Sequence, residues 1–86
     1  MFKDLDPLLH SQLRLSIISL LMSVEEANFN FIKDTTGATS GNISIQIKKL
    51  QQAGYIRVEK TFKNNYPNTS VSITEKGKEA FETYVN

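Results

Sequence analysis

The segment that most constrains the fold of this chain is GNISIQIKKLQQAGYI, which covers residues 41–56. Isoleucine occupies every second position near its start, a spacing typical of a strand, but the run KKLQQ then breaks the alternation. On a helix, at about 100° per residue, Ile43, Ile47 and Leu50 fall within roughly 60° of one another and form one apolar face. The pattern therefore predicts a helix, and it leaves Ile45 on the opposite face.

The predicted helix covers about residues 40–53, because Thr39 can cap its start and Gly54 can supply the left-handed residue that often ends a helix. Its second face carries one isoleucine, Ile45, among small, polar and basic residues. These neighbours are Gly41, Ser44, Lys48, Lys49 and Gln52. Single exposed apolar residues are common, so Ile45 is either a plain surface side chain or a contact for a partner.

A longer helix is predicted near the start of the chain. Asp6 and Pro7 are typical of a helix start, and the apolar run after them continues to about Val24. Apolar residues lie on two sides of this helix, with Leu9, Leu13, Ile17, Leu20 and Val24 on one side and Leu15, Ile18 and Met22 on the other. A chain of 86 residues is too short to cover both sides, so we expect a second copy against the second side.

A short helix is predicted between these two. Residues 25–27 are expected to form a connector, and Asn28 can cap a helix over about 29–36. Gly37 is well suited to end that helix, so the chain turns between Gly37 and Thr39 before the next helix begins.

The last third of the chain predicts a hairpin and a final helix. The segments YIRVEKTF (55–62) and TSVSIT (69–74) alternate apolar and polar residues, and KNNYPN (63–68) between them consists of turn residues, which predicts a long tip. Thr74 can cap a final helix. The apolar face of that helix is formed by Ala80, Phe81, Tyr84 and Val85. Gly77 inside this helix costs about 1 kcal/mol relative to alanine, so we expect close packing there.

Positive charge gathers in the middle of the chain. The net charge is only +1, but residues 40–66 hold five basic side chains and one acidic side chain. Charge concentrated on one segment is the electrostatic footprint of nucleic-acid binding, and an ordinary solvated face can have the same composition.

Several classes of function lack the residues they need. The chain has no cysteine, which excludes disulfides and thiolate metal sites. Its one histidine, His10, is better explained by packing or an interface than by a role as metal ligand or base. We therefore expect no metal, no cofactor and no enzymatic activity. No apolar run reaches the roughly 18 residues of a membrane span, and the start does not resemble a secretion signal, so a cytoplasmic protein without a membrane partner is expected.

The predicted order of helix, helix, turn, helix, hairpin and helix resembles a winged helix-turn-helix, an α+β and mainly α fold, in a single domain over residues 1–86. The segment LDPLLHSQLRLSIISLL resembles the opening helix of small ArsR- and MarR-like regulators. The segment SGNISIQIKKLQQAGYIRVEK is similar to their recognition helix and first wing strand. TFKNNYPNTSVSITEKGKEAFETY is similar to their wing and closing helix, with ITEKG in place of the LT-x-x-G signature.

This resemblance implies a sequence-specific DNA-binding transcriptional regulator that binds an imperfect palindrome as a homodimer. It places the third helix in the major groove and the wing, about 62–69, on the backbone or in the minor groove. The residues that the resemblance and the polar helix face assign to DNA are Thr39, Ser40, Gly41, Asn42, Ser44, Ile45, Lys48, Lys49, Lys63, Asn64, Asn65 and Tyr66. Those expected at the dimer interface are Leu15, Ile18, Met22, Phe81, Tyr84 and Val85.

The tip of the wing departs from the family pattern. Related wings often carry a Gly-Arg pair at the tip, where this chain has Asn64 and Asn65. A small-molecule effector is compatible with the family, but no residue pattern indicates one, and the residues do not define the operator, the regulated genes or the direction of regulation. The alternative function is a winged helix that binds protein within a larger assembly. Such a module should lack the clustered lysines, so the charge pattern favours DNA.

Overall fold

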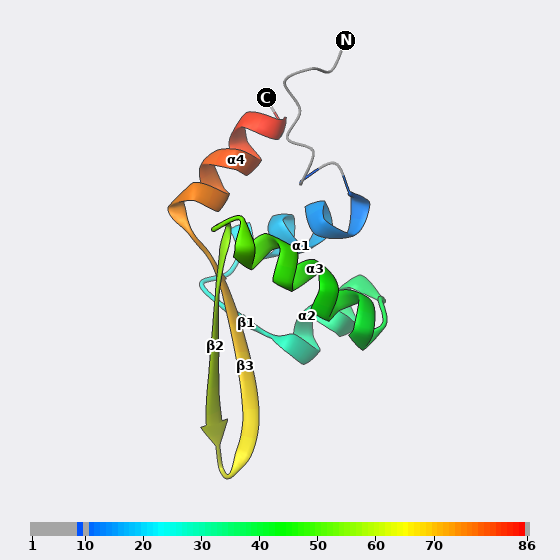
Figure 1. The fold of residues 1–86 in the computed structure, drawn as a ribbon, viewed down its shortest axis with the longest axis vertical. Coiled ribbons are helices and arrows are strands. Elements are labelled where there is room, and N and C mark those ends of the chain that lie inside the picture. Colours follow the sequence, from blue (N-terminus) through cyan, green and yellow to red (C-terminus); the bar gives the residue numbers. More distant parts are fainter. Residues whose placement is uncertain (1–8, 10, 86) are drawn as a thin grey trace.

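The computed structural model describes residue 9 and residues 11–85, except for the side chain of Lys63. In chain order the elements are α1 (Gln12–Met22), β1 (Ala27–Asn28), α2 (Phe29–Thr36), α3 (Ser40–Gln52), β2 (Ile56–Lys63), β3 (Tyr66–Ile73) and α4 (Glu75–Val85). The helices gather toward one end of the molecule, and the β2–β3 hairpin extends away from them (Figure 1). This arrangement is the mainly helical α+β winged helix that the sequence predicts.

The local signals around α2 and α3 act as predicted. The side chains of Asn28 and Thr39 each accept a hydrogen bond from a first-turn amide, at 2.7 Å and 3.2 Å. Gly37 and Gly54, which follow the two helices, have φ angles of 74° and 81°. These positive φ angles lie in the left-handed region that favours glycine. The bounds of α2 and α3 therefore follow from residues at their own ends.

The first helix is shorter than predicted. Ser11 is the N-cap of α1 in an extended conformation, with φ −78° and ψ 129°, and Leu9 lies in a turn before it. α1 ends at Met22, shortly before the predicted end. The predicted helix start lies outside the described residues, and so does His10.

Residues of the same chain bury α1 on more than one side. Ile17, Ile18 and Leu21 are all fully buried. Ile17 and Ile18 are neighbours in sequence, so they lie about 100° apart around the helix, and the chain covers part of both predicted apolar sides. Ile18 packs inside its own chain, which removes it from the side chains that a second copy could contact.

The wing is a tight hairpin. Its two strands pair along their whole length, and Asn64 and Asn65 alone connect them, with φ angles of 53° and 69°. Positive φ at both central residues is what a type I′ turn requires, and asparagine tolerates this conformation better than most residues. The predicted long tip over residues 63–68 is therefore wrong, because the strands continue into that segment.

A third strand, β1, lies where a connector was expected. Ala27 pairs with Val71 and Asn28 with Ser70, which gives an antiparallel sheet in the order β1-β3-β2. A strand of two residues is too short to show alternation in the sequence. β1 pairs with Ser70 and Val71 and does not extend along β3 as far as Pro67. At Pro67, β3 therefore has a neighbouring strand on one side alone, and a proline without an N–H is tolerated there.

The core lies between α1, the inner face of α3 and the base of the sheet. Its buried members are Leu9, Ile17, Ile18, Leu21, Ala27, Ile32, Ile43, Ile47, Leu50, Ile56 and Val71. The burial of Ile43, Ile47 and Leu50 confirms the predicted apolar face of α3. Packing of this face turns Ile45 and its polar neighbours toward solvent.

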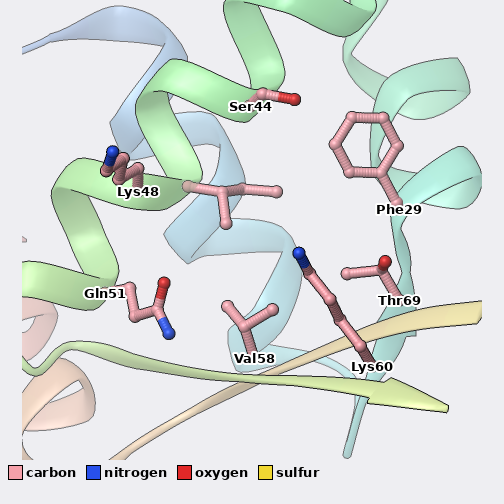
Figure 2. Close-up of a pocket in the computed structure, with 8 residues that line it drawn as sticks. Phe29, Ser44, Lys48, Gln51, Val58, Lys60 and Thr69 are labelled. Carbon is pink, nitrogen blue, oxygen red and sulfur yellow. The ribbon is translucent and has the colours of Figure 1, made fainter.

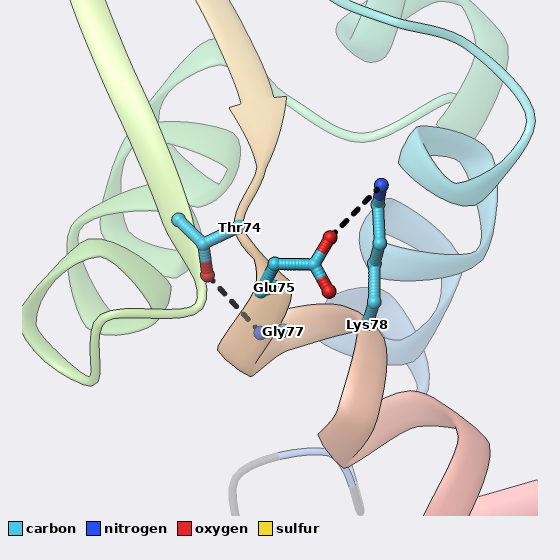
Figure 3. A network of polar contacts seen from close by, with 4 residues as sticks. All are labelled: Thr74, Glu75, Gly77 and Lys78. Carbon is cyan, nitrogen blue, oxygen red and sulfur yellow. Dashed lines mark hydrogen bonds and ion pairs between the residues drawn. The ribbon is translucent and has the colours of Figure 1, made fainter.

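Thr74 and Gly77 join the start of α4 to the loop before β2. The Thr74 hydroxyl donates to the Gly54 carbonyl oxygen at 2.7 Å. It also accepts from the Gly77 N–H at 3.1 Å (Figure 3). The Thr74 N–H donates to the Tyr55 carbonyl oxygen at 3.0 Å. A β-carbon on Gly77 would overlap that same oxygen, which confirms the close packing predicted at this glycine.

Candidate nucleic-acid interface

The outward face of α3 is open to solvent along its length. Ile45, near the centre of this face, is 55% exposed. The other positions of α3 and its cap that were predicted to contact DNA are also exposed, namely Thr39, Ser40, Gly41, Asn42, Ser44, Lys48 and Lys49. An isoleucine among hydrogen-bonding and cationic side chains offers apolar and polar contacts on one surface, as a base-reading helix needs.

The start of α3 can bind an anion. Thr39 satisfies the Asn42 N–H, but the first turn of any helix has further amides without partners inside the helix. A β-carbon built on Gly41 would have no heavy atom within 4 Å, so the backbone is accessible there. These outward amides and the positive end of the helix dipole are suited to a phosphate group.

Two linked hydrogen bonds fix one side of α3, and the sequence did not predict them. Arg14 of α1 donates to the Gln46 side-chain oxygen at 2.6 Å, and the Gln46 amide donates to the Asn42 side-chain oxygen at 2.9 Å. The Asn42 oxygen is therefore engaged, and its NH₂ group is the part that Asn42 can offer as a donor to a partner. The i, i+4 spacing of Asn42 and Gln46 is visible in the sequence, but the position of Arg14 depends on the tertiary fold.

On its other side, α3 borders a groove that lies between this helix and the hairpin. Its volume is about 420 Å³, and it is lined by Phe29, Ser44, Ile47, Lys48, Gln51, Val58, Lys60 and Thr69. Lys60 extends from β2 toward α3 (Figure 2). The groove has an apolar base, two lysine side chains and two hydroxyl groups. These groups suit a partner molecule that carries negative charges on an apolar framework. Lys60 and Thr69 were not among the predicted contacts, because strand alternation does not reveal which helix a strand faces.

The tip of the wing is exposed and carries no basic residue at its turn. Asn64 and Asn65 form the turn and are both exposed, and Tyr66 is 74% exposed. The side chain of Lys63 lies outside the described part of the chain. Phe62, which is not one of the predicted contact residues, is 78% exposed.

The surfaces predicted for a dimer lie on α1 and α4. Leu15 and Met22 are partly buried, and Val85 is 58% exposed. Phe81 and Tyr84 pack partly against the core. An open depression on α1 is lined by Leu15, Ser16, Ser19, Leu20 and Ser23. α4 lies at the opposite end of the molecule from the hairpin tip (Figure 1).

Within residues 9 and 11–85 no group of three or more histidine, aspartate or glutamate side chains is placed to hold a metal ion. In the same part of the chain no helix combines the length and the apolar character needed to cross a bilayer.

This chain matches a known protein family and one curated protein. Residues 13–86 match a protein family described as the winged helix DNA-binding domain. The uncharacterized protein MJ0432 of Methanocaldococcus jannaschii is 33% identical to this chain over 76 residues, which cover 88% of this chain and 83% of that protein. The match to a DNA-binding family agrees with the expectation that the chain is not an enzyme.

Solved structures share the fold. A transcriptional regulator homologue from Pyrococcus horikoshii OT3 has a TM-score of 0.85 and 28% identity, covering 91% of this chain and 77% of its own. The YusO protein from Bacillus subtilis has a TM-score of 0.74 and 14% identity, covering 87% of this chain and 52% of its own. NadR, solved in complex with 4-hydroxyphenylacetate, has a TM-score of 0.78 and 18% identity, covering 92% and 58%. The last two likenesses concern the fold alone.

Proposed function

Because this chain belongs to the winged helix DNA-binding domain family, we propose that it is a sequence-specific transcriptional regulator. In this proposal α3 enters the major groove, and the hairpin lies along the adjacent DNA backbone. The observation that supports it best is the outward face of α3. There, Ile45 is exposed among hydrogen-bonding groups and lysines, and no other part of the described chain covers it.

Base reading is assigned to the centre of this face. Asn42 presents NH₂ donors, which match the acceptor atoms on purine edges in the major groove. The Ser44 hydroxyl can donate or accept, and Ile45 can pack against a thymine methyl group. The polar contacts of Asn42 and Ser44 and the apolar contact of Ile45 read different base-edge groups, so together they give a sequence preference.

Phosphate contacts are assigned to the two ends of the face. Lys48 and Lys49 neutralise phosphates and release counterions. Thr39, Ser40 and Gly41 at the helix start bind a further phosphate through backbone amides and hydroxyl groups. These contacts position α3 on the duplex and carry no base information themselves.

The groove between α3 and the hairpin seats one DNA strand in this proposal. Lys48 and Lys60 line the groove from α3 and from β2, and the hydroxyls of Ser44 and Thr69 also line it. Beyond the groove, the wing tip follows the backbone through Lys63, Asn64, Asn65 and Tyr66. Neutral asparagines at the turn predict a weaker salt dependence for the tip than for α3.

The proposed regulator works as a homodimer on an imperfect palindrome. The contact is assigned to the outer sides of α1 and α4, with Leu15, Met22, Phe81, Tyr84 and Val85 as its members. Their partial exposure leaves apolar surface for a second copy, whereas Ile18 is fully buried and takes no part. Two copies of α3 then reach successive major grooves roughly 34–36 Å apart.

Selection of bound sequences from random DNA tests the proposal. We expect an enriched palindromic site, and we expect binding to it to fall steeply between about 0.05 and 0.2 M salt. Ile45→Ala should alter the preferred base at one position of each half-site, while Lys48→Ala should reduce the slope of log affinity against log salt by about 1. Absence of DNA retention at either salt concentration would favour the alternative, a winged helix that binds protein.

A further inference from the structure

The outer half of the hairpin carries a large apolar side chain that the proposed contacts do not use. Phe62 is 78% exposed, and among the large hydrophobic side chains of the described residues it is the most exposed. One exposed apolar residue is common on protein surfaces, so exposure by itself assigns no role. The position of Phe62 within the hairpin is more informative.

The strand register places Phe62 on the same face of the hairpin as the groove. Alternate residues of β2 project from one face, and Ile56, Val58, Lys60 and Phe62 share it. Exposure increases along this series: Ile56 is 3% exposed, Val58 is partly buried and Lys60 is exposed in the groove wall. Phe62 is the next member of the series, beyond the groove and on the side of α3.

The cross-strand neighbour of Phe62 is apolar. Pro67 is its register partner in β3, lies on the same face, is also exposed and lacks an N–H. Phe62 follows Lys60 by two residues, or about 6.6 Å along the strand, a length comparable with one nucleotide step. A DNA strand that contacts Lys60 through a phosphate therefore reaches an apolar surface at its next nucleotide.

We propose that Phe62, backed by Pro67, is an apolar contact in the minor groove that presses on the sugars and opens a base step. This inference rests on the proposed function. Apolar side chains that enter the minor groove partly unstack a step and bend the duplex toward the major groove, which in this arrangement holds α3. Steps such as TA and CA deform most easily, so the contact selects for a flexible step outside the site that α3 reads.

Repeating the DNA selection with Phe62→Ala tests the inference. The wild-type protein enriches TA or CA at a position beyond the α3 site, and a donor–acceptor dye pair on the DNA ends reports a bend. Phe62→Ala loses that preference, reduces the bend and lowers affinity about tenfold, because an apolar contact of one aromatic side chain is removed. The salt slope stays unchanged, because no phosphate contact is lost. Phe62→Leu retains most of the bend and the preference.

Two matched variants act as controls. Thr61 precedes Phe62 in β2, and its side chain projects from the opposite face. The variant Thr61→Ala therefore binds DNA like wild type. Lys60→Ala reduces the salt slope by about 1 and keeps the step preference. Wild-type bend and step preference in Phe62→Ala would overturn the inference, and so would an equal loss in Thr61→Ala. A change in sedimentation without DNA would instead assign Phe62 to a contact between two copies. If the wild-type protein selects no DNA sequence, the proposed function fails before this inference is reached.

Discussion

The base and the tip of the β2–β3 hairpin follow the same alternating pattern but lie in opposite surroundings. At the base, Ile56 is 3% exposed and Val71 is fully buried, and Thr74 ties the end of β3 to the loop before β2. At the tip, Phe62 is 78% exposed, and the turn at Asn64 holds its geometry through backbone preference. The base is therefore determined by packing and the tip by local turn chemistry.

This difference separates stability from binding within one hairpin. Substitutions at the base should lower the free energy of unfolding, because they leave voids, overlaps or unpaired polar groups in the core. Substitutions of exposed side chains on the strands near the tip should change stability little and DNA binding more, whereas the turn asparagines also hold the backbone conformation.

Gly77→Ala should destabilise the protein most, by about 3 kcal/mol, because the added methyl group overlaps the Tyr55 backbone oxygen. Urea unfolding followed by circular dichroism measures this change. Gly41→Ala is the matched control. It adds the same methyl group to an exposed helical position with open space around it, and it should raise the free energy of unfolding by up to about 1 kcal/mol. Equal effects of the two substitutions would contradict the packing explanation.

Thr74→Ala should cost about 1–2 kcal/mol, because the Gly77 N–H loses its cap and the Gly54 carbonyl loses its donor. Thr74→Ser keeps the hydroxyl and should stay within about 0.5 kcal/mol of wild type in the same unfolding measurement. A loss as large in Thr74→Ser as in Thr74→Ala would show that the methyl group, and not the hydrogen bonds, is responsible.

Asn65→Ala should cost about 1 kcal/mol, because alanine adopts the left-handed conformation at φ 69° less easily than asparagine. Asn65→Gly accepts this conformation without strain and should be nearly neutral or slightly stabilising. Thermal unfolding of both variants measures the difference. A neutral Asn65→Ala would mean that tertiary contacts, and not local turn chemistry, hold the tip.

Phe62→Ala should change the free energy of unfolding least, by no more than about 0.5 kcal/mol, because the side chain is already in water. Val58→Ala, on the same face of β2 but packed against the core, should cost about 1 kcal/mol. The order should reverse in DNA binding, where Phe62→Ala has the larger effect. A Phe62→Ala variant that unfolds as easily as Val58→Ala would remove the distinction between base and tip.

Much of α3 could be predicted because its information is local. Ile43, Ile47 and Leu50 recur at helical spacing, and Thr39 and Gly54 mark the ends. Each signal acts within a few residues, so the buried side of the helix and the exposed position of Ile45 followed from sequence. The predicted DNA contacts of that face stay predictions until binding is measured.

The wing could be predicted only in part. The segment KNNYPN contains several turn residues, and Pro67 in particular is typical of a loop. A proline fits a strand where one edge is unpaired, and the sequence does not show where β1 ends beside β3. The long tip was predicted for this reason, although Asn64 and Asn65 have the backbone preference that a two-residue turn needs.

Local sequence patterns predict the helical faces and the caps of α2, α3 and α4, because each depends on spacing or on contacts within a few residues. They also predict close packing at Gly77, because glycine is costly inside a helix, although the contact itself is with the backbone oxygen of Tyr55, far away in the chain. Tertiary structure alone decided that Ile18 is enclosed within one chain, that Arg14 reaches Gln46, and that Lys60 faces α3 across a groove. These three features join segments far apart in the chain. No local pattern encodes them, because packing of the whole core sets the distance and angle between those segments.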